Sequence, residues 1–466
     1  MKKKYCYFIL ALIFSFHVVH AQFVKPDPHY TYIEDDSPSY IPDSKFIIAK
    51  TGHVYKRNNF GKVVRYLSNG NVDTSFGVGG SITPPQNMYY PVAVNDNALY
   101  LAYIDGTLGL KLITKYDLNG NLDTGFGING VANLQSGPSG TFIEDVVINT
   151  DQSLYVKYKT SVIKVLPTGI IDTVFGTKSF VEPIKILRTS NNFLLVYYNS
   201  STVTECKLIK YSPNGSLDNS FGNLGEVIIF SRIGTANINS SNEIYAIVPG
   251  SLVKYTNIGN IDTSFGTNGS VSLLSIVGNI SNNISISAID FDNDNKIVLF
   301  GLWYNMSYNY DFIGRLNVDG TKDNSFSENG TSSYYINPTF FAVWNSFVDQ
   351  GKIINNVEFV IVHNLRGSAT WRLYKTMKYI SSSSSLSVNE NNNKPKDLYF
   401  NNPFNNELTF NLKEKIKNVE IYDESGKLIL NEKTSKLNTF SLAKGIYFIK
   451  ITTESNKIIY RKGIKN

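Results

Sequence analysis

The chain has very few of the residues that usually build metal sites and disulfides. Its 466 residues include two cysteines and five histidines. Cys6 lies in the first 21 residues, which leaves Cys206 alone and excludes a disulfide within the rest of the chain. After residue 21 the motifs H-x-x-H, C-x-x-C, G-x-S-x-G and the P-loop do not occur. We therefore expect no metal and no cofactor, and the sequence identifies no catalytic residue.

Long apolar runs are also scarce, and the one at the start of the chain is short. Lys2, Lys3 and Lys4 precede an apolar run at 7–19, and Val19 and Ala21 are the small residues of a cleavage site. The run is too short to span a bilayer, so it predicts a secretory signal peptide at 1–21, with a retained anchor helix as the alternative. We expect an exported protein with no stable transmembrane segment.

Positive charge is concentrated at the two ends. The chain carries a net charge of +6, with three lysines in the first 21 residues and an excess of five positive charges in 386–466. The region between them therefore has a net charge of −2. Nucleic acid is not an expected partner, because that role requires a basic surface.

The sequence contains six copies of one turn-forming stretch. The first copies read NGNVDTSFG and NGNLDTGFG, and each copy has an aspartate followed three residues later by a phenylalanine. The pairs are Asp73 and Phe76, Asp123 and Phe126, Asp172 and Phe175, Asp218 and Phe221, Asp262 and Phe265, and Asp323 and Phe326. A recurrence at 44 to 61 residues is typical of a repeat array.

Other positions recur with the aspartate. Glycine stands three residues before it and a basic residue stands eight before it in all six copies, as with Gly120 and Lys115. The aspartate is expected to accept a bond from a backbone N–H in the following turn, and the phenylalanine is expected to fill an apolar slot between modules. The basic residue either pairs with a nearby carboxylate or reaches solvent, or else contributes to a charged ring on one face.

Two or three further strand-like runs lie between successive copies, which gives three to four short strands per module, the size of a propeller blade. These residues resemble the delta-60 repeat, a family of β-propeller-type repeats in exported bacterial proteins. The resemblance implies an all-β fold with a propeller at 22–380. Six copies close modules ending near 80, 130, 179, 225, 269 and 330, and 331–380 supplies further strands. We predict seven blades, with six or eight as alternatives.

The composition changes after the propeller. Residues 381–397 are rich in serine and asparagine, as in a linker, and 398–466 contains alternating strands of a small β-sandwich. Asn402-Pro403-Phe404, the stretch 419–423 and the start of the strand at Gly445 resemble the C-terminal sorting domain of the Bacteroidetes type IX secretion system, in a pattern that begins near 386. Asn401 stands where the family usually has proline. The resemblance implies the type IX machinery as a partner and a secreted or outer-surface location.

Candidate ligand-binding residues are aromatic side chains that depart from the repeat. They are Trp303, Tyr304, Tyr308 and Tyr310 in the long sixth module, and Tyr89 and Tyr90 after the first. Aromatic rings among polar residues suit stacking on sugars or packing against a protein, although blade strands are the simpler interpretation. The stretch DFDNDNK, with Asp290, Asp292 and Asp294, is similar to a calcium loop but lacks its glycine and glutamate, which favours a hairpin turn.

Two functions remain open on this sequence. The favoured hypothesis is an exported, non-enzymatic propeller that acts as an interaction scaffold for a protein or glycan. The alternative is a glycan-processing hydrolase or lyase, which would need carboxylates converging from several blades.

Overall fold

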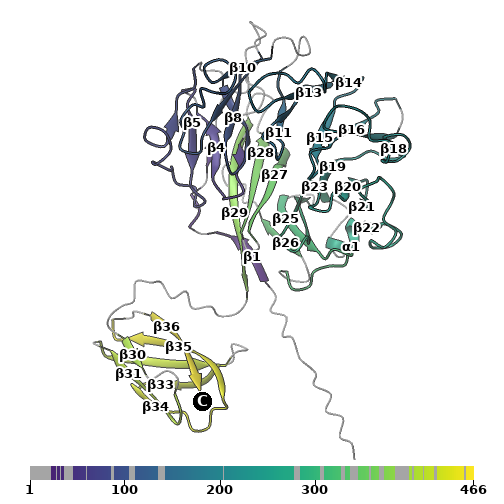
Figure 1. Cartoon of the computed structure of the whole chain (residues 1–466). Helices are drawn as coiled ribbons and strands as arrows, with labels where there is room; N and C mark the ends of the chain where they lie inside the picture. The colour runs from purple at the N-terminus through teal and green to yellow at the C-terminus, as the bar shows by residue number, and fades with distance from the viewer. Residues whose placement is uncertain are drawn as a thin grey trace, which may run out of the picture. The chain divides into compact units, whose positions relative to one another are not determined.

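The structure is a computed structural model whose described residues form two compact units, Phe23–Ser381 and Ser382–Asn466 (Figure 1). The described residues are 22–465, except 28, 32, 36–45, 59, 86–88, 104–110, 135–141, 203, 278–283, 305–308, 327–330, 336–344, 356–357, 367–371, 384–397, 401–403, 413, 424–427 and 456–457. The predicted signal peptide at 1–21 lies outside them. Among the described residues no helix has the length and apolarity needed to cross a membrane.

The larger unit is built from four-stranded antiparallel sheets in which each strand pairs with the next along the chain. The first three sheets are β3 (Ile47–Ile48), β4 (Val54–Arg57), β5 (Val63–Tyr66) and β6 (Ser81–Ile82); β7 (Tyr89–Val94), β8 (Leu99–Tyr103), β9 (Leu112–Tyr116) and β10 (Val131–Asn133); and β11 (Asp145–Ile148), β12 (Leu154–Lys157), β13 (Ser161–Val165) and β14 (Lys178–Ser179).

Three more sheets repeat this order. They are β15 (Lys185–Arg188), β16 (Leu194–Asn199), β17 (Cys206–Tyr211) and β18 (Glu226–Ile229); β19 (Thr235–Ile238), β20 (Ile244–Val248), β21 (Ser251–Tyr255) and β22 (Ser270–Ser272); and β23 (Ile284–Phe291), β24 (Ile297–Tyr304), β25 (Asn309–Leu316) and β26 (Thr331–Tyr335). A single short helix, α1 (Leu273–Val277), follows β22 among the described residues.

The last sheet of this unit joins the two ends of the propeller sequence. Its C-terminal strands are β27 (Asn345–Asn355), β28 (Glu358–Arg366) and β29 (Arg372–Ser383). The N-terminal strands β1 (Gln22–Pro26) and β2 (Glu34–Asp35) both pair with β29, so the N-terminal segment completes the sheet (Figure 1).

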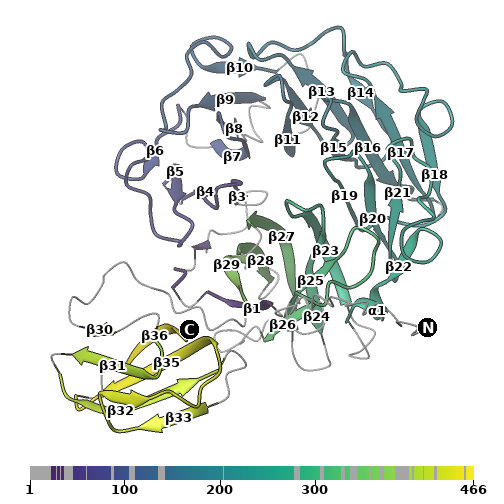
Figure 2. The same cartoon turned by 60° about the horizontal axis from the view of Figure 1, so that its bottom comes forward.

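The sheets follow one another around a common centre, with the first strand of each sheet innermost (Figure 2). Contacts between successive innermost strands support this order, because β7, β11, β15, β19, β23 and β27 each contact the next in the series. The middle strands are rich in β-branched and aromatic residues and are buried on both faces, as in β13, because each sheet lies between two others.

Apolar clusters lie between neighbouring sheets. One of them joins Tyr100 and Phe126 of the second sheet to Val156 and Ile163 of the third. Another joins Ile48 and Val54 of the first sheet to Val360 of the last, which closes the series. Because every sheet contributes to two such clusters, the sheets stabilise one another rather than folding around separate cores.

The structure confirms the predicted all-β propeller and corrects the predicted module ends. The described residues of this unit form seven sheets. Seven is also the number of blades that the sequence analysis preferred. Each turn motif lies between the third strand and the outermost strand of one sheet, as Asp73 lies between β5 and β6. The strand after the motif pairs backward, so five modules end a few residues later than the sequence analysis placed them, and the third ends at Ser179 as placed.

The smaller unit consists of two antiparallel sheets around one apolar core, in accord with the expected sandwich. One sheet contains β30 (Leu398–Phe400), β31 (Glu407–Leu412) and β34 (Lys436–Asn438), and the other contains β32 (Ile416–Tyr422), β33 (Leu428–Glu432), β35 (Gly445–Thr453) and β36 (Ile458–Lys465). Because β29 extends to Ser383, the first residues of the predicted linker at 381–397 belong to a strand, and its remainder lies outside the described residues.

Candidate functional site

The repeated aspartate is fixed against the third strand of its own sheet by a backbone hydrogen bond. Its N–H donates to the carbonyl of the basic residue eight positions earlier, at 2.8 to 3.1 Å in all six copies. The donor and acceptor residues are Asp73 and Arg65, Asp123 and Lys115, Asp172 and Lys164, Asp218 and Lys210, Asp262 and Lys254, and Asp323 and Arg315. This pairing brings the two side chains to the same place in every copy.

The basic residue and the aspartate form an ion pair in each copy. The nitrogen–oxygen distances are 2.8 Å for Arg65 and Asp73, 2.7 Å for Lys115 and Asp123, 3.5 Å for Lys164 and Asp172, 2.9 Å for Lys210 and Asp218, 2.8 Å for Lys254 and Asp262, and 2.7 Å for Arg315 and Asp323. Of the two hypotheses for the basic residues, the structure confirms the paired one.

The other carboxylate oxygen caps the turn that follows. Asp123 Oδ1 accepts a hydrogen bond from the Gly125 N–H at 3.1 Å, and the residue two positions after the aspartate donates at 3.0 to 3.1 Å in every copy. This confirms the predicted Asx-type turn. Both oxygens are thus engaged, one by the backbone and the other by a cation, and the hydrogen bond and charge of Lys115 lower the pKa of Asp123.

The phenylalanine of each copy is a buried plug, as predicted. All six rings are at most 1 % exposed, and each lies in an apolar cluster shared by two consecutive sheets. Phe126, for example, packs edge-on against Tyr100 with a centroid distance of 5.8 Å. In the first and sixth copies the guanidinium of Arg65 or Arg315 also lies 4.7 Å from the ring of Phe76 or Phe326.

The motif also links one sheet to the next. The N–H of Gly77 donates to the Asn119 carbonyl of the following copy at 2.8 Å, and Gly127 donates to Thr168 in the same way at 2.7 Å. Gly120 has a positive φ of 91°, and a Cβ there would lie 2.9 Å from the Gly77 nitrogen. Glycine recurs before the aspartate because the turn needs positive φ and because the neighbouring turn leaves no room for a side chain.

A second series of contacts between sheets was not expected from the sequence. The turns between first and second strands place Asn192, Asn242 and Asn295 at φ of 66°, 64° and 58°. Asn192 Oδ1 accepts from the Thr150 N–H at 2.8 Å, and Asn242 Oδ1 accepts from the Ser190 N–H at 2.6 Å. Asparagine tolerates left-handed backbone, and recurrent turn asparagines are the only sequence signal for this link.

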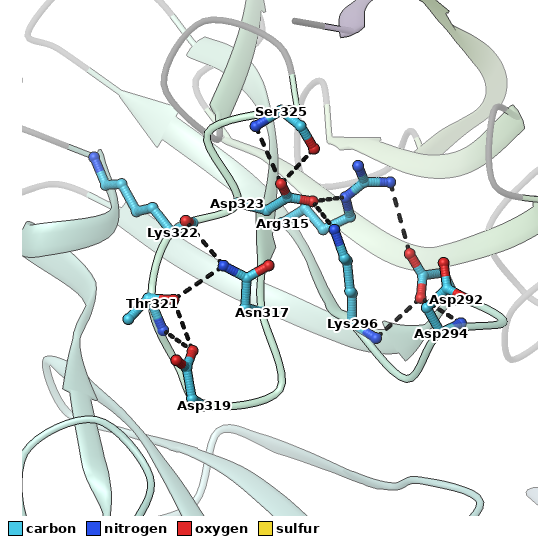
Figure 3. A network of polar contacts seen from close by, with 10 residues as sticks. All are labelled: Asp292, Asp294, Lys296, Arg315, Asn317, Asp319, Thr321, Lys322, Asp323 and Ser325. Carbon is cyan, nitrogen blue, oxygen red and sulfur yellow. Dashed lines mark hydrogen bonds and ion pairs between the residues drawn. The ribbon is translucent and has the colours of Figure 1, made fainter. Parts of the chain in front are cut away.

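The sixth copy carries an extended polar network (Figure 3). Asp323 Oδ2 accepts from Lys296 Nζ at 2.7 Å as well as from Arg315 Nε at 2.7 Å, and Arg315 also lies 3.6 Å from Asp292. Burial raises the pKa of Asp323, but the hydrogen bonds from Lys296 and Ser325 and the charge of Arg315 outweigh burial and lower that pKa to about 2. The ion-paired part of the network contains two carboxylates, Asp292 and Asp323, and two cations, Lys296 and Arg315.

The stretch DFDNDNK forms the predicted hairpin turn between β23 and β24. Asp292 Oδ1 accepts from the backbone N–H of Asp294 at 3.0 Å and of Lys296 at 2.9 Å, and Asp290 pairs with Lys352 at 3.7 Å. Within the described part of the chain, no group of three or more histidine, cysteine or acidic residues could hold a metal ion. The Cys206 thiol is buried, and burial raises its pKa to about 12, so it is not a nucleophile.

Tyr89 and Tyr90, two of the ligand-binding candidates, lie in the blade strand β7. They are 1 % and 4 % exposed. The Tyr89 ring packs 5.1 Å from that of Tyr103, and the Tyr90 hydroxyl donates to the Ile143 carbonyl of the next sheet. Both side chains therefore contribute to packing between sheets.

The aromatic candidates of the sixth sheet lie on its central hairpin. Trp303 and Tyr304 end β24, Tyr310 lies near the start of β25, and Trp303 is the register partner of Tyr310. Tyr304 is the partner of Asn309 in the same ladder. Tyr308 lies outside the described residues. The register brings Trp303 and Tyr310 to one position of the sheet, which the sequence alone did not show.

Comparison with protein families identifies the smaller unit. Residues 399–466 match the family described as a secretion system C-terminal sorting domain. The C-terminal unit is a type IX secretion sorting domain. Such a sorting domain marks a protein that the type IX system exports to the cell surface or beyond. Residues 42–76, which include Asp73 and Phe76, match a family described as a "domain of unknown function (DUF5122) beta-propeller".

Solved structures show only distant likeness to the chain that bears this sorting domain. PorZ, a surface component of the type IX secretion system of Porphyromonas gingivalis, aligns with a TM-score of 0.39 at 10 % identity over 93 % of this chain and 60 % of its own. This chain thus spans 60 % of the length of PorZ. The polysaccharide lyase Uly1 aligns with a TM-score of 0.37 at 11 % identity over 78 % of this chain and 90 % of its own.

A third solved structure, the extracellular domain of a hybrid two-component system from B. thetaiotaomicron, has a TM-score of 0.39 at 10 % identity over 94 % of this chain and 58 % of its own. Likenesses at this level carry no argument about activity. No curated protein matches the sequence.

Proposed function

We propose that the exported propeller is a non-enzymatic binding module for a glycan or a protein, and that the central hairpin of the sixth sheet contributes to its binding surface. The observation that carries this proposal is the register pairing of Trp303 with Tyr310 next to Tyr304. Aromatic residues supply a large apolar contact area at low entropic cost and suit the binding of sugar rings and protein side chains, and the register places two of them at paired positions of one hairpin.

The state of the repeated carboxylates supports a binding role over a catalytic one. A glycosidase needs two carboxyl groups on opposite sides of a bond, one of them with a raised pKa. The motif aspartates instead accept hydrogen bonds from the backbone and from cations, and the pKa values of Asp73, Asp123, Asp218, Asp262 and Asp323 are lowered. They are thus poor general acids.

The test is a glycan array, with crosslinking on intact cells for a protein ligand, using the mature chain. Trp303→Ala and Tyr310→Ala should each reduce the signal at least about tenfold, as for an aromatic at the centre of an interface. Phe230→Ala is the matched control, because this ring is 85 % exposed and lies in a different sheet connection. Equal binding by all four proteins contradicts the role of the hairpin, and product release from any glycan supports the enzymatic alternative.

A further inference from the structure

The last sheet has a basic residue at the position that carries one in the other six sheets. Lys378 is followed by Tyr379 in β29, just as Arg65, Lys115, Lys210 and Lys254 are each followed by tyrosine in the third strands of other sheets. No copy of the motif follows Lys378 in the sequence. Lys378 Nζ lies 2.6 Å from Glu358 of β28, just as Lys254 Nζ lies 2.8 Å from Glu243 as well as meeting its motif aspartate, so an aspartate in the motif position would be the second partner of this lysine.

The contacts of the motif recur around Asp27, near the other end of the propeller sequence. The Asp27 N–H donates to the Lys378 carbonyl at 2.8 Å, and Lys378 Nζ lies 3.6 Å from Asp27 Oδ2. The N–H of His29, two positions on, donates to Asp27 Oδ1 at 2.9 Å. The N–H of Tyr30, three positions on, donates to the Asp27 carbonyl at 3.2 Å, as the phenylalanine does in five of the six other copies.

The contact with the next sheet recurs as well. The Thr31 N–H, four positions after Asp27, donates to the Asn69 carbonyl at 2.8 Å, in the same way that Gly77 donates to Asn119. A Cβ built on Gly70 would overlap the Thr31 carbonyl, which repeats the close packing of Gly120 on Gly77.

We infer that residues 27–31 are a seventh copy of the motif, delivered from the opposite end of the chain, and that strand β29 with the first turn forms a seat for this peptide segment. The seat recognises a turn-forming segment in which an aspartate is followed three residues later by an aromatic side chain. Lys378 engages the carboxylate, and the first sheet receives the end of the segment. Filling the seat joins the last sheet to the first.

Differences from the other copies have physical reasons. Tyr30 stands in the position of the plug phenylalanine and is 5 % exposed. Its hydroxyl donates to Thr376 Oγ1 of β29 at 2.9 Å, and the Ile33 N–H also donates to that oxygen at 3.1 Å. A tyrosine is therefore satisfied in this slot, because the last sheet offers a polar partner that a phenylalanine would leave unused.

An ordinary chain terminus tolerates substitution because few residues pack against it. This segment is different, because it is packed against two sheets. Asp27, Tyr30 and Ile33 contact β29, and Thr31 contacts the first motif, so loss of this segment exposes the interface between the last and first sheets. The two halves of this copy come from the beginning and end of the propeller sequence, so the ring can close only when both are present.

The test uses the full mature chain with a specific protease site inserted between residues 40 and 41. After cleavage the N-terminal peptide should stay bound, and a labelled peptide of residues 22–35 should exchange into the seat. A peptide with Tyr30→Ala should compete about a hundredfold less well, as expected for emptying a buried aromatic slot, whereas Tyr30→Phe should remain within about tenfold. Asp27→Ala should also compete less well.

If the peptide dissociates and the main melting transition is lost, the result also supports the seat, because the propeller then does not stay folded without its seventh copy. Two results overturn the inference: release of the peptide with an unchanged melting curve, or equal competition by the native and Tyr30→Ala peptides. Uncleaved Tyr30→Ala chain provides a second readout, because a melting temperature equal to that of the native chain also contradicts the seat.

Discussion

Arg315 Nε lies 2.7 Å from Asp323 Oδ2, and both side chains are almost fully buried, at 6 % and 5 % exposed. The pair occupies the same position as Lys115 and Asp123 in the second copy, where the side chains are 22 % and 37 % exposed. One motif therefore holds its ion pair in environments that differ strongly in access to water. Buried pairs depend on both partners far more than exposed ones do, so the six copies should differ in their sensitivity to substitution.

Substitution of the aspartate should be costly in the sixth copy and mild in the second. Asp123→Ala should reduce the free energy of unfolding by about 0.5 to 2 kcal/mol, the range for a lost turn cap. Asp323→Ala should cost about 3 to 5 kcal/mol, because it removes from a buried site the carboxylate that both Arg315 and Lys296 contact. Urea titrations of both variants measure the difference, with the exposed Asp96→Ala as control. Equal costs would show that burial of the pair is not what matters.

The buried phenylalanine should account for much of the cohesion between sheets. Phe126→Ala should reduce the free energy of unfolding by about 3 to 5 kcal/mol, the range for emptying a core aromatic site. Phe230→Ala removes the same side chain from an 85 % exposed position and should leave the melting temperature nearly unchanged. If the two variants have the same melting temperature in a calorimetric scan, the interpretation of Phe126 as a buried plug is wrong.

Acid should weaken the sixth copy through Asp323. Its pKa in the folded chain is about 2, below its ordinary value of 3.8, so its charged form stabilises the fold. This contribution is present above about pH 4 and is lost as the pH falls toward 2. We expect the native chain to lose more stability across this window than Asp323→Asn, as measured by urea unfolding at a series of pH values. Parallel pH profiles would contradict the lowered pKa.

The sorting domain should direct export without supporting the propeller. The two units are compact by themselves, with the boundary between Ser381 and Ser382. Deletion of 386–466 retains β29 to Ser383 and should leave the propeller folded but held in the periplasm. Cell fractionation with proteolysis of each fraction measures both properties. Equal amounts of propeller in the medium with and without the tail contradict the sorting role.

The repeat carried most of the information that could be obtained from the sequence. Asp123 and Phe126 recur with fixed spacing, so one turn predicted the others, and burial of Phe126 followed from the need of each module for a shared core. The sequence left the ion pair of Lys115 with Asp123 as one of two alternatives. A spacing of eight residues brings these two side chains together only when the turn folds the chain back onto the strand.

Other features depend on contacts that no local pattern specifies. Tyr89 and Tyr90 follow the loop-like stretch PPQNM in the sequence, yet they pack into adjacent clusters because β7 is an innermost strand. The seventh copy around Asp27 has tyrosine and threonine in place of phenylalanine and glycine, and its lysine lies at the far end of the propeller. Only the pairing of β1 and β2 with β29 brings these parts together.

The central claim is that the repeated aspartates are structural and bind no ion, since one oxygen caps a turn and the other meets a cation in every copy. Melting the mature chain by calorimetry in calcium and then in a chelator tests it most directly. If the aspartates bind no ion, the two melting curves should superimpose, and resistance to proteolysis should be equal in the two conditions. A melting temperature that rises with calcium and falls with the chelator would contradict the account and would make the repeat a metal-binding array.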